Sequence, residues 1–134
     1  MTDERTILIV DDEEVMREVV TALLAREGYA VRTAATGEEG LEIARAETLD
    51  AAVVDVMMPG IGGMATLDEL RKFDRELPVI MLTAYGSVES AKEAIKAGAF
   101  DYITKPFKHD EVLKVLRNAV ERRRLALENR TLRQ

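Results

Sequence analysis

The feature that most constrains this chain is an apolar run, residues 51–59 (AAVVDVMMP), whose single charge, Asp55, lies near its carboxyl end. A run rich in β-branched and small apolar residues is typical of a central parallel strand covered on both faces, and Pro59 ends its hydrogen-bond ladder. Ligands bind at the carboxyl edge of open α/β sheets, so we expect Asp55 to meet solvent and a reactant there. The simpler alternative is an aspartate that only caps the next turn.

Similar apolar runs alternate with helical periodicity along the rest of the chain. We expect strands at residues 6–10, 29–35, 50–55, 77–82 and 99–104, the second of them polar enough for a sheet edge. Helices are predicted at residues 15–27, after a capping box at 36–39, at 64–73, at 87–97 and from an Asp110 cap onward. This alternation predicts an α/β fold, a doubly wound five-stranded parallel sheet with five helices.

Composition narrows the function classes. The net charge of −6 argues against a nucleic-acid grip through the bulk surface, and 134 residues suit one domain. No cysteine is present, which excludes disulfides and thiolate metal sites and permits a cytoplasmic location. The lone His109 cannot form a metal cluster, and we expect it to face solvent at a helix start with no role. No apolar run suits a membrane span or signal peptide.

Five chemically distinctive side chains follow the predicted strands, at the point where each strand ends. They are two adjacent acids, a third acid, a hydroxyl and a cation: Asp11, Asp12, Asp55, Thr83 and Lys105. Parallel topology brings the carboxyl ends of the strands to one edge, so we expect these side chains to lie together. Asp11 and Asp12 have a simpler interpretation as acids that stabilise the first helix dipole, and Glu13 and Glu14 share it.

Three carboxylates in one cleft require a cation. Two of them about 4 Å apart repel by about 1 kcal/mol in water and about 4 kcal/mol at an effective dielectric constant near 20. An all-oxygen cluster favours Mg²⁺, which commonly bridges one or two carboxylates to phosphate oxygens. An aspartate can attack phosphorus while a metal, a hydroxyl and an ammonium group share the non-bridging oxygens. Asp55, Thr83 and Lys105 suit these roles.

These residues also carry a resemblance. The motifs resemble the signature of response-regulator receiver domains, the phosphorylated half of bacterial two-component systems, over residues 6–120: Asp11-Asp12, Asp55 with Pro59-Gly60, Thr83-Ala84 and Lys105-Pro106-Phe107. Each motif alone is weak, but together they stand in order at the ends of the right strands. The resemblance implies a receiver fold of flavodoxin-like type. One departure is Gly62, where an aspartate is frequent.

The resemblance implies a role for each matching residue. Asp55 would accept a phosphoryl group from a phosphohistidine of a sensor histidine kinase. Asp12, Asp55 and the main-chain carbonyl of Met57 would bind Mg²⁺, with Asp11 assisting through water. Lys105 would contact the phosphoryl group.

The resemblance also implies a cis bond between Lys105 and Pro106. Thr83 and Tyr102 match the family's switch pair, in which the hydroxyl moves to the phosphate and the ring turns inward. From its place on a strand alone, Tyr102 is more often a core residue.

The resemblance implies a phosphorylation-dependent switch in which residues 87–120 pass the signal to an output domain or partner that acts in transcription. A stand-alone phosphorelay receiver is one alternative, and a degenerate receiver is another. A phosphatase of the haloacid-dehalogenase type would want a second acid where Met57 stands, so we expect no turnover on external substrates. A flavodoxin-like cofactor domain would require a Gly-rich phosphate-binding loop after the first strand, and this chain has none there.

The end of the chain differs in composition. We expect a receiver domain at residues 1–121 and, at 122–134, a helical linker or the start of a C-terminal extension, with too few leucines to pack on the sheet. Such linkers resemble those of enhancer-binding transcription activators. Leu125 and Leu132 lie one heptad apart, with Leu127 and Asn129 between them, which favours a weak, phosphorylation-strengthened homodimer through residues 87–120 and this tail. A solvated helix that frays is the alternative.

Overall fold

The computed structural model describes residues 4–83 and 88–132. Its elements alternate strand and helix: β1 (Thr6–Val10), α1 (Glu14–Arg26), β2 (Ala30–Ala34), α2 (Gly37–Ala46), β3 (Ala51–Asp55), α3 (Gly62–Phe73), β4 (Val79–Thr83), α4 (Val88–Lys96), β5 (Asp101–Thr104) and α5 (His109–Leu132). Ala84 of the Thr83-Ala84 motif, Ser87 at the expected start of the fourth helix, and the last two residues of the expected extension lie outside the described residues.

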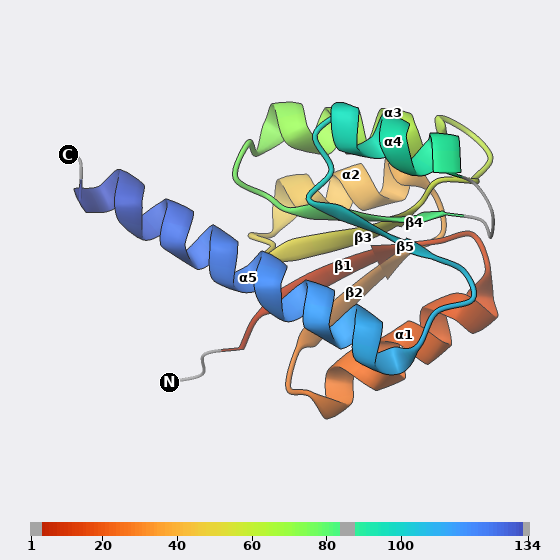
Figure 1. Ribbon diagram of the computed structural model, residues 1–134, viewed down its shortest axis with the longest axis horizontal. Helices are drawn as coiled ribbons and strands as arrows, with labels where there is room; N and C mark the ends of the chain where they lie inside the picture. The colour runs from red at the N-terminus through yellow and green to blue at the C-terminus, as the bar shows by residue number, and fades with distance from the viewer. Residues whose placement is uncertain (1–3, 84–87, 133–134) are drawn as a thin grey trace.

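The five strands form one parallel sheet in the order β2-β1-β3-β4-β5 (Figure 1). The predicted α/β doubly wound class is therefore confirmed, with β2 at an edge as its polar sequence indicated. The order reverses direction between β1 and β3, which is where ligands bind in such sheets. Asp11 and Asp55 follow or end these two central strands.

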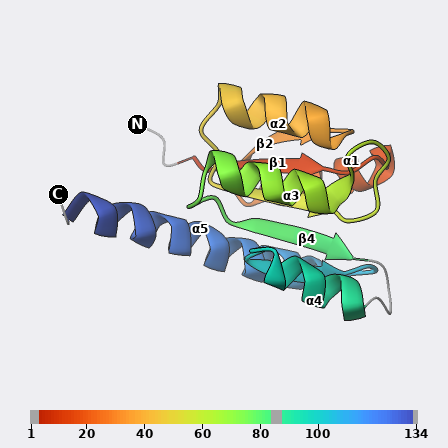
Figure 2. The same ribbon diagram turned by 90° about the horizontal axis from the view of Figure 1, so that it is seen from above.

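Both faces of the sheet are covered, because successive side chains of a strand point to opposite faces. In β1, Ile7 and Ile9 pack with α1 and α5, whereas Leu8 and Val10 pack with α2, α3 and α4. Figure 1 shows these two helical layers on either side of the sheet, and Figure 2 looks down on the layer of α2, α3 and α4. All five residues of β3 are buried, which explains why its sequence is a nearly continuous apolar run.

The helix boundaries follow local chemistry. Thr36 is the N-cap of α2, and its side-chain oxygen accepts a hydrogen bond from the Glu39 amide at 3.1 Å, as the capping-box pattern predicts. The Asp110 cap is wrong, because α5 begins one residue earlier, at His109. The Lys108 carbonyl accepts from the amide of Glu111 at 3.1 Å, so Asp110 already lies inside the first turn. His109 is exposed at this helix start, as expected.

Helix α5 continues without a break to Leu132 and runs past the sheet (Figure 1). It leaves the domain later than its composition suggests, because the side chain of Arg123 is buried and donates to Asp74 at 2.9 Å. The first turn of the tail therefore contacts the domain through an ion pair rather than through its leucines, and Leu125 and Leu127 are exposed. Among the described helices, none combines the length and apolar character that crossing a membrane requires.

Candidate functional site

The strand ends bring the five distinctive side chains to one edge of the sheet. Asp55 ends β3, Thr83 ends β4, Asp11 follows β1 and Lys105 follows β5. Asp11, Asp55 and Thr83 are buried, at 0%, 4% and 1% exposure, whereas Asp12 is exposed. The edge therefore holds two buried carboxylates, those of Asp11 and Asp55, and one exposed carboxylate, that of Asp12.

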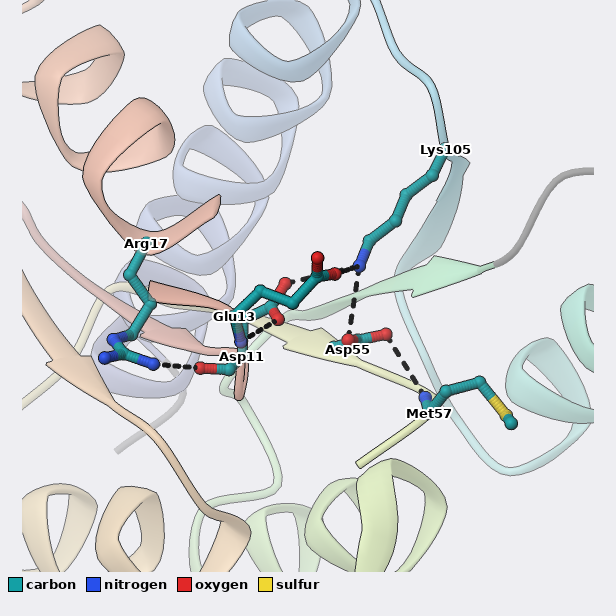
Figure 3. A network of polar contacts seen from close by, with 6 residues as sticks. All are labelled: Asp11, Glu13, Arg17, Asp55, Met57 and Lys105. Carbon is teal, nitrogen blue, oxygen red and sulfur yellow. Dashed lines mark hydrogen bonds and ion pairs between the residues drawn. The ribbon is translucent and has the colours of Figure 1, made fainter. Parts of the chain in front are cut away.

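Lys105 is the hub of this edge. Its Nζ lies 3.2 Å from Asp55 Oδ2, 3.4 Å from Asp11 Oδ2 and 3.3 Å from Glu13 Oε1 (Figure 3). Its main-chain amide donates to the Thr83 carbonyl at 2.8 Å, which extends the β4–β5 pairing, and the Lys105–Pro106 peptide bond is cis. One ammonium group thus contacts three acids from two segments of the chain.

The surroundings of Asp55 raise its pKa to about 6. Burial is the largest cause, the Asp11 carboxylate adds to it, and the Lys105 ammonium only partly opposes both. Burial likewise opposes the charge of Lys105, but Asp55, Asp11 and the hydrogen bonds to Asp55 and Glu13 outweigh it, so the pKa of Lys105 lies above its usual value. The site holds more negative charge than one lysine compensates.

Short main-chain contacts orient the two buried acids. Asp11 Oδ1 accepts from the Glu13 amide at 3.0 Å, and its carbonyl accepts from Arg17 Nη1 at 2.8 Å. Asp55 Oδ1 accepts from the Met57 amide at 3.2 Å, while the Met57 side chain points outward and is 70% exposed (Figure 3). The main chain of Met57 therefore belongs to the site, whereas its side chain does not.

Gly63 sets how closely α3 approaches β3. A Cβ atom added there would lie 2.1 Å from the Asp55 carbonyl oxygen, and the Gly63 amide donates to the Val56 carbonyl at 3.2 Å. Gly60 and Gly62 adopt positive φ angles of 78° and 80°. That Gly63 is the point of closest approach follows only from the packing of α3 against β3.

The donor set fits a hard divalent cation. Asp11, Asp12 and Asp55 each offer a carboxylate oxygen, and these atoms all lie within 4.8 Å of one another. Oxygen-only ligands with one exposed carboxylate suit Mg²⁺, which keeps several waters. The raised pKa of Asp55 agrees with a cation site. The residues present do not fully stabilise the ionised carboxylate, and a bound cation would do so.

Thr83 and Tyr102 lie on neighbouring strands. Thr83 pairs with Thr104 in the β4–β5 register, and Tyr102 is two residues earlier on β5, beside Met81. Thr83 Oγ1 is buried and has no hydrogen-bond partner among the described residues, although buried hydroxyls are normally bonded. Tyr102 is 42% exposed, so its ring is outside the core.

One member of the site escaped the sequence analysis. Glu13 was assigned, with Glu14, to the dipole of the first helix, but its carboxylate lies 3.3 Å from Lys105 Nζ. The run of four acids after β1 was a signal for excess charge, yet it did not distinguish which acid would meet a lysine 92 residues away.

Comparisons with known proteins agree with this geometry. The family model described as "Response regulator receiver domain" matches residues 7–117. The chain is 37% identical over 134 residues to regulatory protein AtoC of Escherichia coli, covering 100% of this chain and 29% of AtoC. It is 41% identical over 128 residues to the C4-dicarboxylate transport transcriptional regulatory protein DctD of Pseudomonas aeruginosa, covering 95% and 28%. The chain thus spans less than a third of these relatives.

Solved structures show the same fold. NtrX from Brucella abortus in complex with ADP has a TM-score of 0.93 and 37% sequence identity, covering 98% of this chain and 30% of that one. A response regulator receiver domain protein from Clostridium thermocellum has a TM-score of 0.86 and 34% identity, covering 91% and 98%. The second protein is nearly as short as the segment it matches, whereas NtrX extends well beyond it.

Proposed function

This chain belongs to the receiver-domain family of two-component response regulators, and we propose that Asp55 is the side chain that accepts the phosphoryl group in it. The observation that carries the proposal is the contact of Lys105 Nζ with Asp55 at 3.2 Å inside a cluster of three acids. A carboxylate held beside an ammonium group at a solvent-accessible sheet edge is a suitable nucleophile for phosphorus.

In the proposed reaction, an Asp55 carboxylate oxygen forms a bond to phosphorus as the bond from phosphorus to the donor's imidazole nitrogen breaks. Burial and the Asp11 charge make an ionised Asp55 reactive, and Lys105 is positioned to follow the developing phosphoryl charge. The family binds Mg²⁺ at an acidic pocket; here Asp12, Asp55 and the Met57 carbonyl would hold it, with Asp11 assisting through water, and it would supply charge neutralisation.

The proposal gives Thr83 and Tyr102 the role of a switch. The buried hydroxyl of Thr83, which has no partner among the described residues, is a donor that a phosphoryl oxygen on Asp55 would accept. As that hydroxyl turned toward the phosphate, the exposed ring of Tyr102 would gain room to move inward. The phosphoryl group must favour the active state by about 5.5 kcal/mol to move it from 1:99 to 99:1.

Members of this family act as switches, and we propose that this chain turns over no external substrate. Met57 occupies the place of the second acid that a haloacid-dehalogenase phosphatase would use. Its 70% exposed thioether supplies no proton, so no general acid for a leaving alcohol stands at that position.

Receiver domains partner with sensor kinases and carry output domains, and AtoC and DctD are named as regulators. We extend this to a cytoplasmic regulator in which residues 1–121 receive the phosphoryl group and residues 122–134 link to an output domain that controls transcription. The shifted face would be residues 87–120. Arg122 and Arg123 still contact the domain, so the linker would transmit movement from its first turn.

A phosphorylation-strengthened homodimer completes the proposal. Leu125 and Leu127 are 51% and 39% exposed on α5, and Arg124 is paired with Glu121 and Glu128 of the same helix. These pairs reduce the repulsion that an arginine run would cause across a parallel dimer. Sedimentation across a concentration series, with and without beryllofluoride, tests it; a strict monomer in both conditions, or a dimer unaffected by removal of residues 122–134, contradicts the role of the tail.

The central experiment is phosphorylation with acetyl phosphate and Mg²⁺, followed by intact mass and site mapping. The expected result is an acid-stable, base-labile gain of one phosphoryl group on Asp55. Asp55→Asn should abolish it, because the amide is nearly isosteric but a poor nucleophile. The matched control is Asp68→Asn, which changes an exposed acid on α3. Labelling of Asp55→Asn at the wild-type rate would show that Asp55 is not the acceptor.

The switch is tested separately with Thr83→Ala. This variant should accept phosphate, because the nucleophile is intact, but amide shifts over residues 88–120 should respond weakly. Shifts after phosphorylation that match those of the wild type would refute the coupling between Thr83 and this face.

A further inference from the structure

At the opposite edge of the sheet, a second cleft gathers positive charge. Its volume is about 290 Å³, and it lies where β4 and β5 begin, bounded by the end of α3 and by the α5 extension. Four arginines line it against one acid, Glu76: Arg71, Arg75, Arg122 and Arg123. Nothing in the phosphoacceptor reaction uses this cleft.

Arg123 supplies the observation that points to a ligand. Its side chain is only 6% exposed and donates one hydrogen bond, from Nη2 to Asp74 at 2.9 Å. Its Nε and Nη1 atoms are buried and have no hydrogen-bond partner among the described residues. A guanidinium group has five N–H donors and no acceptor, so an acceptor-rich, negatively charged group would satisfy it.

Two neighbouring clefts share Arg123, and their charges distinguish them. The other cleft, of about 310 Å³, is lined by Arg45 and Arg123 together with Glu47 and Asp74, so its charges balance. Glu47 is already paired with Arg32 at 2.9 Å. The first cleft has four arginines against one glutamate, and a surplus of positive charge remains even after Asp74 is counted as the partner of Arg123. An anion is therefore expected in the first cleft.

The surrounding structure does not cancel this surplus. Helices α3 and α4 end at this edge, and each carboxyl terminus contributes only about half a negative charge. Arg71 donates to the Arg75 carbonyl, in the loop after α3, at 3.3 Å, which leaves its charge in place. Arg122 lies 5.6 Å from the centroid of the Phe100 ring, a contact that holds the guanidinium group over the cleft without neutralising it.

We propose that this cleft binds a phosphate-type oxyanion, free or carried by a small metabolite. Arginine forks match the oxygens of a phosphate group in pairs, and several converge here from α3, the loop after it and α5. The volume is near the lower limit for small-molecule sites, which suits a ligand no larger than a mononucleotide. Because α5 contributes two of the arginines, the ligand would join the linker helix to the body of the domain.

The test is a titration of the 134-residue chain with inorganic phosphate, followed through the backbone amides of Gly98, Ala99 and Phe100 by NMR. Mg²⁺ is omitted and ionic strength is held with sodium chloride, which separates this cleft from the acidic edge and from general screening. Saturable shifts confined to the cleft are expected. Shifts that sodium chloride alone reproduces, or no shifts, would overturn the proposal.

The variant for this test is Arg75→Gln combined with Arg122→Gln. Both side chains are exposed, so the fold should survive, and binding should weaken about tenfold or more. Arg45→Gln is the control for each single exchange, since it removes one positive charge from the balanced cleft and should change binding less than about twofold. Equal binding by the double variant and the wild type would contradict the site.

Adenosine monophosphate and adenosine identify the source of the oxyanion. Tighter binding of the monophosphate than of inorganic phosphate indicates a metabolite, and equal binding indicates free phosphate; both support the site. Adenosine binding as well as its monophosphate would overturn it, because the arginines would then play no part.

Discussion

The two edges of this sheet carry opposite charges. At the carboxyl edge, Asp11, Glu13 and Asp55 converge on Lys105, and negative charge exceeds positive. At the amino edge, four arginines meet in a cleft with one glutamate. Parallel topology explains the acidic edge, because it collects the strand ends on one side; the arginines of the opposite edge come from α3, the loop after it and α5. Charged residues that are scattered along the sequence thus form an acidic cluster at one edge of the sheet and a basic cluster at the other.

The edges also differ in how their buried groups are satisfied. Asp55 accepts from both Lys105 and the Met57 amide, so its own chain supplies partners for the ionised form. Arg123 has Asp74 as its bonded partner, while two of its nitrogens have none among the described residues. A carboxylate that is fixed in place, but whose ionised form is destabilised, suits a chemical reaction. A buried guanidinium group with unbonded donors suits the binding of an anion.

The largest expected effect comes from removing an acid at the carboxyl edge. Asp12→Ala should weaken Mg²⁺ binding and slow phosphorylation on the order of 100-fold, because it removes the exposed ligand of the cluster. The rate of labelling by acetyl phosphate across an Mg²⁺ series measures this. Glu14→Ala, an exposed acid in the first turn of α1, is the control and should behave as wild type. An unchanged Mg²⁺ midpoint in Asp12→Ala would remove Asp12 from the metal site.

A second effect tests the packing beneath that edge. Gly63→Ala should destabilise the fold by on the order of 3 kcal/mol, because the new Cβ would collide with the Asp55 carbonyl at 2.1 Å. Gly28→Ala meets no atom within 4 Å and should cost only about 1–2 kcal/mol for its φ of 92°. Urea unfolding compares them. Equal losses would contradict the close approach of α3 to β3 at Gly63, because no positive φ angle adds to the cost at that position.

The raised pKa of Asp55 predicts how metal-free stability changes with pH. The folded chain holds the Asp55 proton more tightly than the unfolded chain, whose aspartates titrate near 3.8, so unfolding free energy should fall between about pH 4 and 6 and then level. The contribution is at most about 3 kcal/mol. Asp55→Asn should remove this component and be the more stable chain at pH 7.

Urea unfolding of both chains from pH 4 to 8, with Mg²⁺ omitted, measures the difference. Asp68→Asn, an exposed acid, should retain the wild-type profile. An Asp55→Asn profile parallel to that of the wild type would show that burial and Asp11 do not destabilise the ionised carboxylate.

The smallest expected effect lies at the amino edge. Asp74→Asn should cost about 1–2 kcal/mol, because it leaves the buried Arg123 without its charged partner while keeping the acceptor for the Glu76 amide. The phosphorylation rate should not change. Asp74→Asn combined with Arg123→Met should recover part of the loss, and a double-mutant cycle without coupling would contradict the ion pair.

Local sequence patterns predicted most of the framework. Apolar runs located all five strands within two residues of each end; for β1, β3 and β4 the reason is that burial on both faces leaves no polar alternation. The capping pattern at Thr36 located α2, because a side-chain cap joins residues that are only three positions apart in the sequence. At the start of α5 the pattern was wrong by two residues, because an Asp110 cap predicts a helix from residue 111 whereas α5 begins at His109; helix boundaries are the least sharply defined part of an element.

The sequence by itself determined the strands, their alternation with helices and the presence of reactive residues at strand ends, because each depends on neighbours within a few positions. Tertiary structure alone decided that Lys105 meets Asp11 across 94 residues, that Glu13 joins them, and that Arg123 is buried against Asp74. These contacts depend on strand order and on the direction in which α5 leaves the sheet. Side-chain charge and hydropathy encode neither, because the same local pattern is compatible with several arrangements until the whole core is packed.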